Sequence, residues 1–136
     1  MNPSAGTVAG TLGELYYRSC KWRGRLDFFV DPGERVDGHA AWAGSSRFAA
    51  ALAALGVSKG EVVAFLCKSS ARHAVAWFGT TLASAVACSM HVRETPERLG
   101  EALAWLDARV LVFDPDLEEL ARAAIIASGR ALTTIC

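Results

Sequence analysis

The chain has 136 residues, of which 52% are hydrophobic and 21% charged, and its 14 basic and 14 acidic side chains cancel at neutral pH. This length predicts a single domain over residues 1–136 with a buried core, and the apolar content excludes a disordered chain. No lysine–arginine block stands out, so the sequence predicts neither nucleic-acid binding by phosphate neutralisation nor a polybasic membrane anchor.

The N-terminus lacks the positive charge and apolar run of a secretory signal. No stretch approaches the ~18 uninterrupted apolar residues of a membrane-spanning helix. A cytoplasmic protein without a membrane span is therefore expected. The four cysteines, Cys20, Cys67, Cys88 and Cys136, are far apart and form no C-x-x-C pair, which predicts reduced structural thiols and no zinc site.

The first elements are a helix, a strand and a turn. Apolar residues at near-helical spacing predict a helix over residues 11–22 that ends at Gly24. Residues 26–30 are typical of a short strand, and residues 31–34, Asp-Pro-Gly-Glu, are typical of a turn. No element is predicted over residues 35–41.

A second helix and a buried strand follow. The helix is predicted from about residue 41 to residue 55, with Phe48 and Leu52 on its apolar face. Gly56 is its expected C-terminal cap, because positive φ costs glycine little. Residues 62–67 form a continuous apolar run, which is typical of a strand covered on both faces.

The rest of the chain alternates helices with strands. Helices are predicted from Ser69 or Ser70 through Ser84, from Thr95-Pro96, and from Asp114 or Asp116 to about Ser128, and strands at residues 85–90, 109–113 and 132–135. Strands joined by helices run parallel with right-handed crossovers. The predicted class is α/β, a three-layer sandwich with a mainly parallel sheet.

Several segments occur in an order that resembles a known family. Residues 55–64 read Leu-Gly-Val-Ser-Lys-Gly-Glu-Val-Val-Ala. After them come Ser69-Ser70, Trp77-Phe78, Ala-Ser-Ala-Val-Ala at 83–87, Arg-Glu-Thr-Pro-Glu at 93–97 and Ala-Arg-Val-Leu-Val at 108–112. Over about residues 11–128 this order resembles the N-terminal part of the AMP-forming acyl-CoA synthetases, the ANL adenylating enzymes. A histidine at position 91 is most similar to the fatty-acyl and medium-chain branches.

Three positions depart from the family pattern. Cys67-Lys68 stands where the family has proline-asparagine, and Ser84 stands where it has a glycine before the second strand. Residues 38–42, Gly-His-Ala-Ala-Trp, replace the threonine-tyrosine helix start.

The resemblance implies a reaction that this chain does not complete. A complete family member would join a carboxylic acid to CoA through an acyl-adenylate, using ATP and Mg²⁺. Its phosphate loop, its acids for ribose and Mg²⁺ and its late lysine lie downstream of the matching part. The chain is therefore expected to be an inactive N-terminal fragment, without catalytic, cofactor or metal residues of its own. Gly79-Thr80-Thr81 is only superficially similar to the phosphate loop, because it lies inside a helical pattern without free amides.

His91 and Arg93 are the substrate-pocket candidates. They follow the predicted strand 85–90, at the end of a sheet where α/β folds bind ligands. The simpler interpretation is a loop histidine and a surface arginine. His73 is expected on an exposed helix face. Asp114 and Asp116 also follow a strand, and helix capping accounts for both.

Three functions stay open. The first is the N-terminal part of a ligase. The second is a stand-alone, non-catalytic interaction or dimerisation module. The third is a small-ligand-binding α/β domain that uses the strand ends near Met90 and Phe113. A sheet that stops after Ile135 would leave an unpaired apolar edge, through which a homo-oligomer could form.

Overall fold

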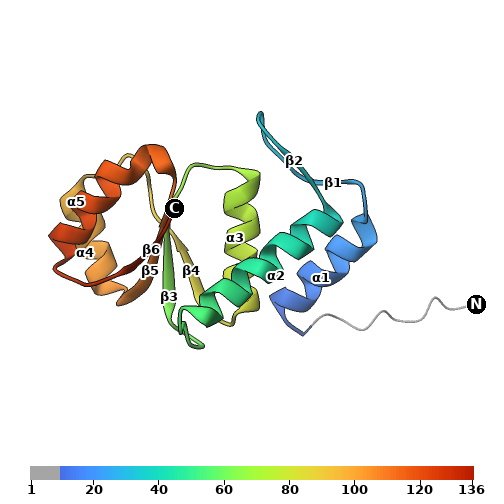
Figure 1. Cartoon of the computed structure of the whole chain (residues 1–136), viewed down its shortest axis with the longest axis horizontal. Coiled ribbons are helices and arrows are strands. Elements are labelled where there is room, and N and C mark those ends of the chain that lie inside the picture. Colours follow the sequence, from blue (N-terminus) through green and yellow to red (C-terminus); the bar gives the residue numbers. More distant parts are fainter. Residues whose placement is uncertain (1–9) are drawn as a thin grey trace, which may run out of the picture.

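Four parallel strands form the centre of the protein, in a computed structural model that describes residues 10–136 (Figure 1). Residues 1–9, on which the absence of a secretory signal was predicted, lie outside the described part. In chain order the elements are α1 (Leu12–Arg23), β1 (Asp27–Val30), β2 (Arg35–Asp37), α2 (Gly38–Ala54), β3 (Val62–Leu66), α3 (Ala71–Leu82), β4 (Val86–Ser89), α4 (Pro96–Trp105), β5 (Ala108–Phe113), a 3-10 turn η1 (Pro115–Leu117), α5 (Glu118–Ser128) and β6 (Thr133–Ile135).

The central sheet has the strand order β4-β3-β5-β6, and every pairing in it is parallel. Helices α4 and α5 lie on one face, and α2 and α3 lie on the other (Figure 1). The predicted α/β class and its three layers are confirmed. No helix of the described residues is both long and apolar enough to cross a membrane.

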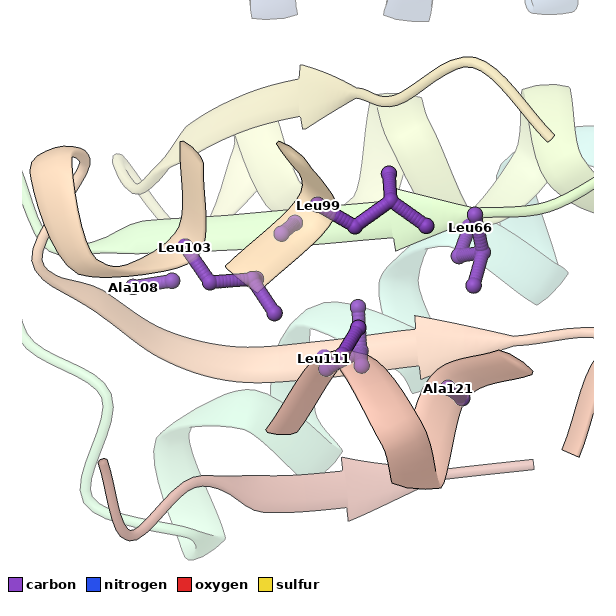
Figure 2. Close-up of a cluster of buried hydrophobic side chains, with 8 residues drawn as sticks. Leu66, Leu99, Leu103, Ala108, Leu111 and Ala121 are labelled. Atoms are coloured by element: carbon purple, nitrogen blue, oxygen red, sulfur yellow. The ribbon is translucent and has the colours of Figure 1, made fainter. Parts of the chain in front are cut away.

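Strand β3 supplies buried side chains to both faces of the sheet. Ala64 and Leu66 pack with Leu103 and Leu111 under α4 and α5, and Figure 2 shows Leu66, Leu103 and Leu111 among the side chains of this cluster. Val63 and Phe65 lie in the opposite core with Leu52 of α2. Because side chains alternate along a strand, a five-residue apolar run fills two separate cores.

A third core joins α1 and the β1–β2 hairpin to the outside of α2 and α3. Tyr16 stacks on Phe78 with ring centroids 4.1 Å apart and an interplanar angle of 5°. The Ser45 hydroxyl donates to the Val75 carbonyl at 2.7 Å, so the Tyr16 hydroxyl donates to Ser45 Oγ at 2.9 Å. Burial raises the pKa of Tyr16, which keeps this donor protonated.

Helix boundaries follow their caps. Thr11 forms a capping box with Glu14, and Ser70 and Thr95 accept hydrogen bonds from the N3 amides of α3 and α4. Helix α2 begins at Gly38, three residues before the predicted start, because Asp37 accepts a hydrogen bond from the Ala40 amide at 2.7 Å. The residues without a predicted element therefore form strand β2 and the first turn of this helix.

The last helix begins in a different way from the one predicted. Neither Asp114 nor Asp116 caps α5, because the 3-10 turn delays its start to Glu118 and leaves it without a side-chain cap. The capping prediction for these two aspartates is therefore wrong. The glycine caps are confirmed, with φ of +75° at Gly56 and +64° at Gly129.

Ser84 adopts a left-handed backbone conformation, with φ of +60°. It is the position where the family pattern has glycine. Its carbonyl accepts a hydrogen bond from the Gly60 amide at 2.9 Å, which fixes the turn between α3 and β4. A side chain in this conformation is strained, because Cβ approaches the following carbonyl oxygen.

We expect Ser84→Gly to raise the free energy of unfolding by up to about 1 kcal/mol, since relief of the left-handed strain exceeds the added backbone entropy. Urea denaturation monitored by circular dichroism measures the change. Ser46→Gly, inside α2, is the control and should lower stability by roughly 0.5–1 kcal/mol. A loss of stability in both variants would contradict the assignment of strain to Ser84.

Candidate functional site

The carboxyl ends of three parallel strands meet at one edge of the sheet. Leu66 of β3 pairs with Phe113 of β5, and Phe65 pairs with Ser89 of β4. The residues that follow these strands therefore come together in space. This is the edge at which open α/β sheets bind ligands.

Lys68 connects the end of β3 to the segment that follows β5. Its backbone amide donates to Asp114 Oδ2 at 2.7 Å, and its ammonium group pairs with the carboxylate of Asp116. The hydrogen bond between Lys68 and Asp116 lowers the pKa of Asp116 and raises the pKa of Lys68. The two aspartates thus hold the loop after β3 in place, and the Lys68 ammonium group neutralises the carboxylate of Asp116.

His73 is half-buried at the same edge, so its predicted place on an exposed helix face is wrong. Its ring stacks on Phe65 with centroids 5.3 Å apart. Nδ1 lies 3.3 Å from the Lys68 carbonyl, and Nε2 lies 3.2 Å from Ser89 Oγ. Because a carbonyl only accepts, Nδ1 carries the proton of that contact. His73 thereby joins α3 to the ends of β3 and β4.

Asp31, which was predicted only as part of a turn, lies at the N-terminus of α3. Its Oδ2 accepts a hydrogen bond from the Ala71 amide at 2.8 Å, and its Oδ1 accepts from the amides of Gly33 and Glu34. The bond from Ala71 is the largest cause that lowers the pKa of Asp31. A carboxylate of the hairpin therefore fills the anion-binding end of this helix.

The two predicted pocket residues lie together on the turn between β4 and α4. His91 and Arg93 are both exposed, and the Arg93 amide donates to His91 Nδ1 at 3.2 Å. His91 lines a groove of about 700 Å³ between β4 and α4, whose other walls include Met90, Arg98 and Trp105, whereas Arg93 is outside this lining. Lys68, Asp114 and Asp116 are not in the groove lining, but Ser89, which contacts His73, is.

Cys67 is half-buried after β3, and its thiol lies 3.7 Å from the Val112 carbonyl. Burial, reinforced by Asp114, raises the pKa of Cys67 to about 12. A thiol in this environment stays protonated and is a poor nucleophile. The four cysteines are free, in agreement with the prediction of reduced thiols.

The segment that superficially resembles a phosphate loop is the interior of α3. Gly79 and Thr80 are buried, and the hydroxyls of Thr80 and Thr81 donate to the carbonyls of Ala76 and Phe78. A Cβ on Gly79 would lie 2.7 Å from the Ser45 carbonyl oxygen, so this glycine allows α2 and α3 to approach. The prediction that these residues are helical is confirmed.

Residues 17–135 match the sequence model of a family described as AMP-binding enzyme. The chain belongs to the AMP-binding enzyme family. A medium/long-chain-fatty-acid–CoA ligase of Mycobacterium tuberculosis, FadD6, is 36% identical over 73 residues, which are 54% of this chain and 12% of that ligase.

Solved structures show the same fold. A benzoate CoA ligase from Burkholderia xenovorans superposes with a TM-score of 0.83 at 21% identity, over 91% of this chain and 25% of that one. The N-terminal domain of FACL13 from Mycobacterium tuberculosis superposes with a TM-score of 0.81 at 24% identity, over 90% and 32% of the two chains. The chain thus spans a small part of each of these relatives.

Among the described residues of this AMP-binding family member, the backbone amides that could bind a phosphate at α3 are already engaged. Asp31 occupies the N-terminus of α3, and the amides of residues 79–81 lie within a helix. Among residues 10–136 no group of three or more His, Cys, Asp or Glu side chains is placed to hold a metal ion. The clustered groups at the strand ends pair with each other, so their arrangement serves to fix loops.

We expect Asp31→Asn to lower stability most above the ordinary aspartate pKa of about 3.9. The folded state lowers the pKa of Asp31, so its contribution is complete above the unfolded pKa and is lost as the pH falls through the folded pKa. Urea unfolding of both proteins across acidic pH measures this. Asp27→Asn, in the same hairpin, is the control because its pair with Arg35 is exposed. A difference between wild type and Asp31→Asn that does not change with pH would contradict the assignment.

Proposed function

We propose that the chain is the N-terminal segment of a ligase that joins a carboxylic acid to CoA through an acyl-adenylate, with ATP and Mg²⁺. The observation that carries this proposal is the match of the AMP-binding enzyme family over residues 17–135. The ligase FadD6 supports a fatty acid as the substrate class. Free cysteines support a reducing, cytoplasmic location.

The role proposed for this segment is structural, with one substrate contact. The sheet and its helices form a frame, and the described residues do not fit the nucleotide or the metal ion. His91 is the residue proposed to contact the acid, because it lies at the edge of the groove between β4 and α4. Arg93 holds His91 Nδ1 through its amide and supplies a positive charge near a carboxylate. By itself the segment is proposed to be inactive.

Calorimetric titration of the purified chain tests this proposal with ATP·Mg²⁺, a medium-chain fatty acid and CoA, each added separately. We expect no heat from ATP·Mg²⁺ and weak binding of the fatty acid. Replacement of His91 or Arg93 by alanine should weaken acid binding about tenfold, the value of a lost charge-assisted hydrogen bond. His39→Ala, an exposed histidine on α2, is the control.

Two results would contradict this assignment. Tight binding of ATP·Mg²⁺ would show that a nucleotide site exists within the chain. Acid binding that is equally weakened by His39→Ala would remove His91 and Arg93 from the site. ATP–pyrophosphate exchange, measured with the same acid, should stay at background.

A second function is a stand-alone interaction or dimerisation module, favoured by the edges of the sheet. In the part of the chain that the structure describes, β4 and β6 each have a neighbour on one side only. Val86 of β4 is 48% exposed. An outer strand offers unpaired backbone groups to a strand of another molecule. Both functions are compatible with the fold and both allow self-association through an unpaired edge, but a dimerisation module requires it.

We expect Val86→Lys to shift a dimer to monomer in sedimentation velocity experiments if β4 pairs with a second copy, since an inserted charge opposes edge pairing. Val30→Lys, an exposed valine in the hairpin, is the control and should have no effect. A wild-type chain that stays monomeric over the accessible concentration range would count against the module.

A further inference from the structure

The outward side of α1 combines exposed apolar residues with basic ones. Figure 1 shows α1 and the hairpin at the end of the molecule farthest from α4 and α5. Trp22 is 82% exposed and Leu15 is 54% exposed, and both lie opposite the buried residues Tyr16 and Cys20. We call this surface the α1 outer face; its members are Leu12, Leu15, Trp22 and Leu26, with Arg18, Arg23 and Arg25, whereas Lys21 lines a hollow against α2 with His39 and Trp42.

The apolar members form a stripe along the helix. Leu12, Leu15 and Trp22 are at i, i+3 and i+10, which places them on one side of α1, and Leu26 follows shortly after the helix ends. This stripe is separate from the aromatic core that holds α1 to α2 and α3, where Tyr16 contacts Trp42 and Phe78. The fold is therefore anchored by one side of the helix and leaves the other available.

Basic side chains predominate along this segment. Residues 11–27 contain Arg18, Lys21, Arg23 and Arg25, and two acidic residues, Glu14 at the start of the helix and Asp27, which pairs with Arg35. The four basic side chains are exposed, and Lys21 and Arg23 extend over the rings of Tyr17 and Trp22, at 5.7 and 6.0 Å from the ring centroids. Because the charges of the whole chain cancel, its net charge does not show this local excess of basic residues.

We propose that the α1 outer face binds the surface of an anionic lipid bilayer, with the helix lying in the plane of the interface. An apolar stripe with Trp, flanked by Lys and Arg, is the pattern of an interfacial helix. Tryptophan favours the boundary between headgroups and acyl chains, and long basic side chains reach phosphates while their stems stay in apolar surroundings.

The observations favour a bilayer over the other acidic partners. A nucleic acid would pair with the arginines but would leave the apolar stripe exposed to water. A folded acidic protein would need a matching concave surface for a convex helix, whereas a bilayer adapts to it. The proposal does not depend on the ligase function, since a catalytically inactive chain would still bind vesicles.

Flotation of the full chain with vesicles tests the proposal. We expect binding to phosphatidylcholine vesicles that contain phosphatidylglycerol, weak binding to phosphatidylcholine alone, and release at high salt because screening shortens the reach of the charges. Soluble glycerol phosphate should not compete, because it offers headgroup chemistry without an apolar phase. Equal binding to both vesicle types, or to neither, would overturn the proposal.

Matched variants separate the stripe from the charges. Trp22→Ser should weaken vesicle binding roughly tenfold, whereas Trp105→Ser should not, although Trp105 is 85% exposed on α4. Joint replacement of Arg23 and Arg25 by glutamine should weaken binding roughly twentyfold.

The charge control is joint replacement of Arg47 and Arg109, exposed on α2 and β5, by glutamine. Equal losses in the matched pairs would show non-specific attraction and overturn the assignment to α1. Circular dichroism of each variant confirms that the fold is retained, so that a loss of binding is read only from folded protein.

Discussion

Burial of β3 on both faces is the constraint on which the other elements depend. Five consecutive apolar residues place Val63 and Phe65 in one core and Ala64 and Leu66 in the other. A strand of this kind needs helices on both sides of the sheet, and parallel neighbours provide them through their crossovers. Parallel pairing in turn directs every carboxyl end to one edge. The cluster of Lys68 with two aspartates at that edge is therefore a consequence of core burial.

A second constraint acts outside the sheet, where α1 is held by aromatic contacts rather than by strand pairing. Tyr16 stacks on Phe78 and donates to Ser45, whose hydroxyl donates to Val75. This chain of contacts satisfies a buried phenol with good geometry, so removal of one partner would leave an unpaired polar group. Because only one side of α1 contacts the rest of the protein, the opposite side is exposed, with its apolar and basic residues.

Local signals predicted most of the fold. Alternating apolar runs, Ser70 and Thr95 as caps, and Gly56 and Gly129 as helix ends act within a few residues, and the structure confirms them. The failures involve distant partners. Asp114 looked like a cap, yet its carboxylate accepts from Lys68, 46 residues away. His73 looked exposed because no sequence pattern shows that α3 lies over the end of β3. The periodicity of a single sequence does not predict contacts between residues that are far apart in the chain.

The same distinction between local and distant partners explains where ligand chemistry is to be sought. At the carboxyl edge, Lys68 is paired with Asp116, and Asp31 fills the N-terminus of α3. Groups that satisfy each other have little capacity left for a ligand, since a ligand would have to displace bonds already made. His91 differs, because its ring accepts one hydrogen bond within its own turn, at Nδ1, and the residue lines a groove. The α1 outer face differs as well, because covering its apolar stripe removes that surface from water and lowers the free energy. Open surfaces of this kind, rather than the best-ordered polar cluster, are where recognition by this chain is expected.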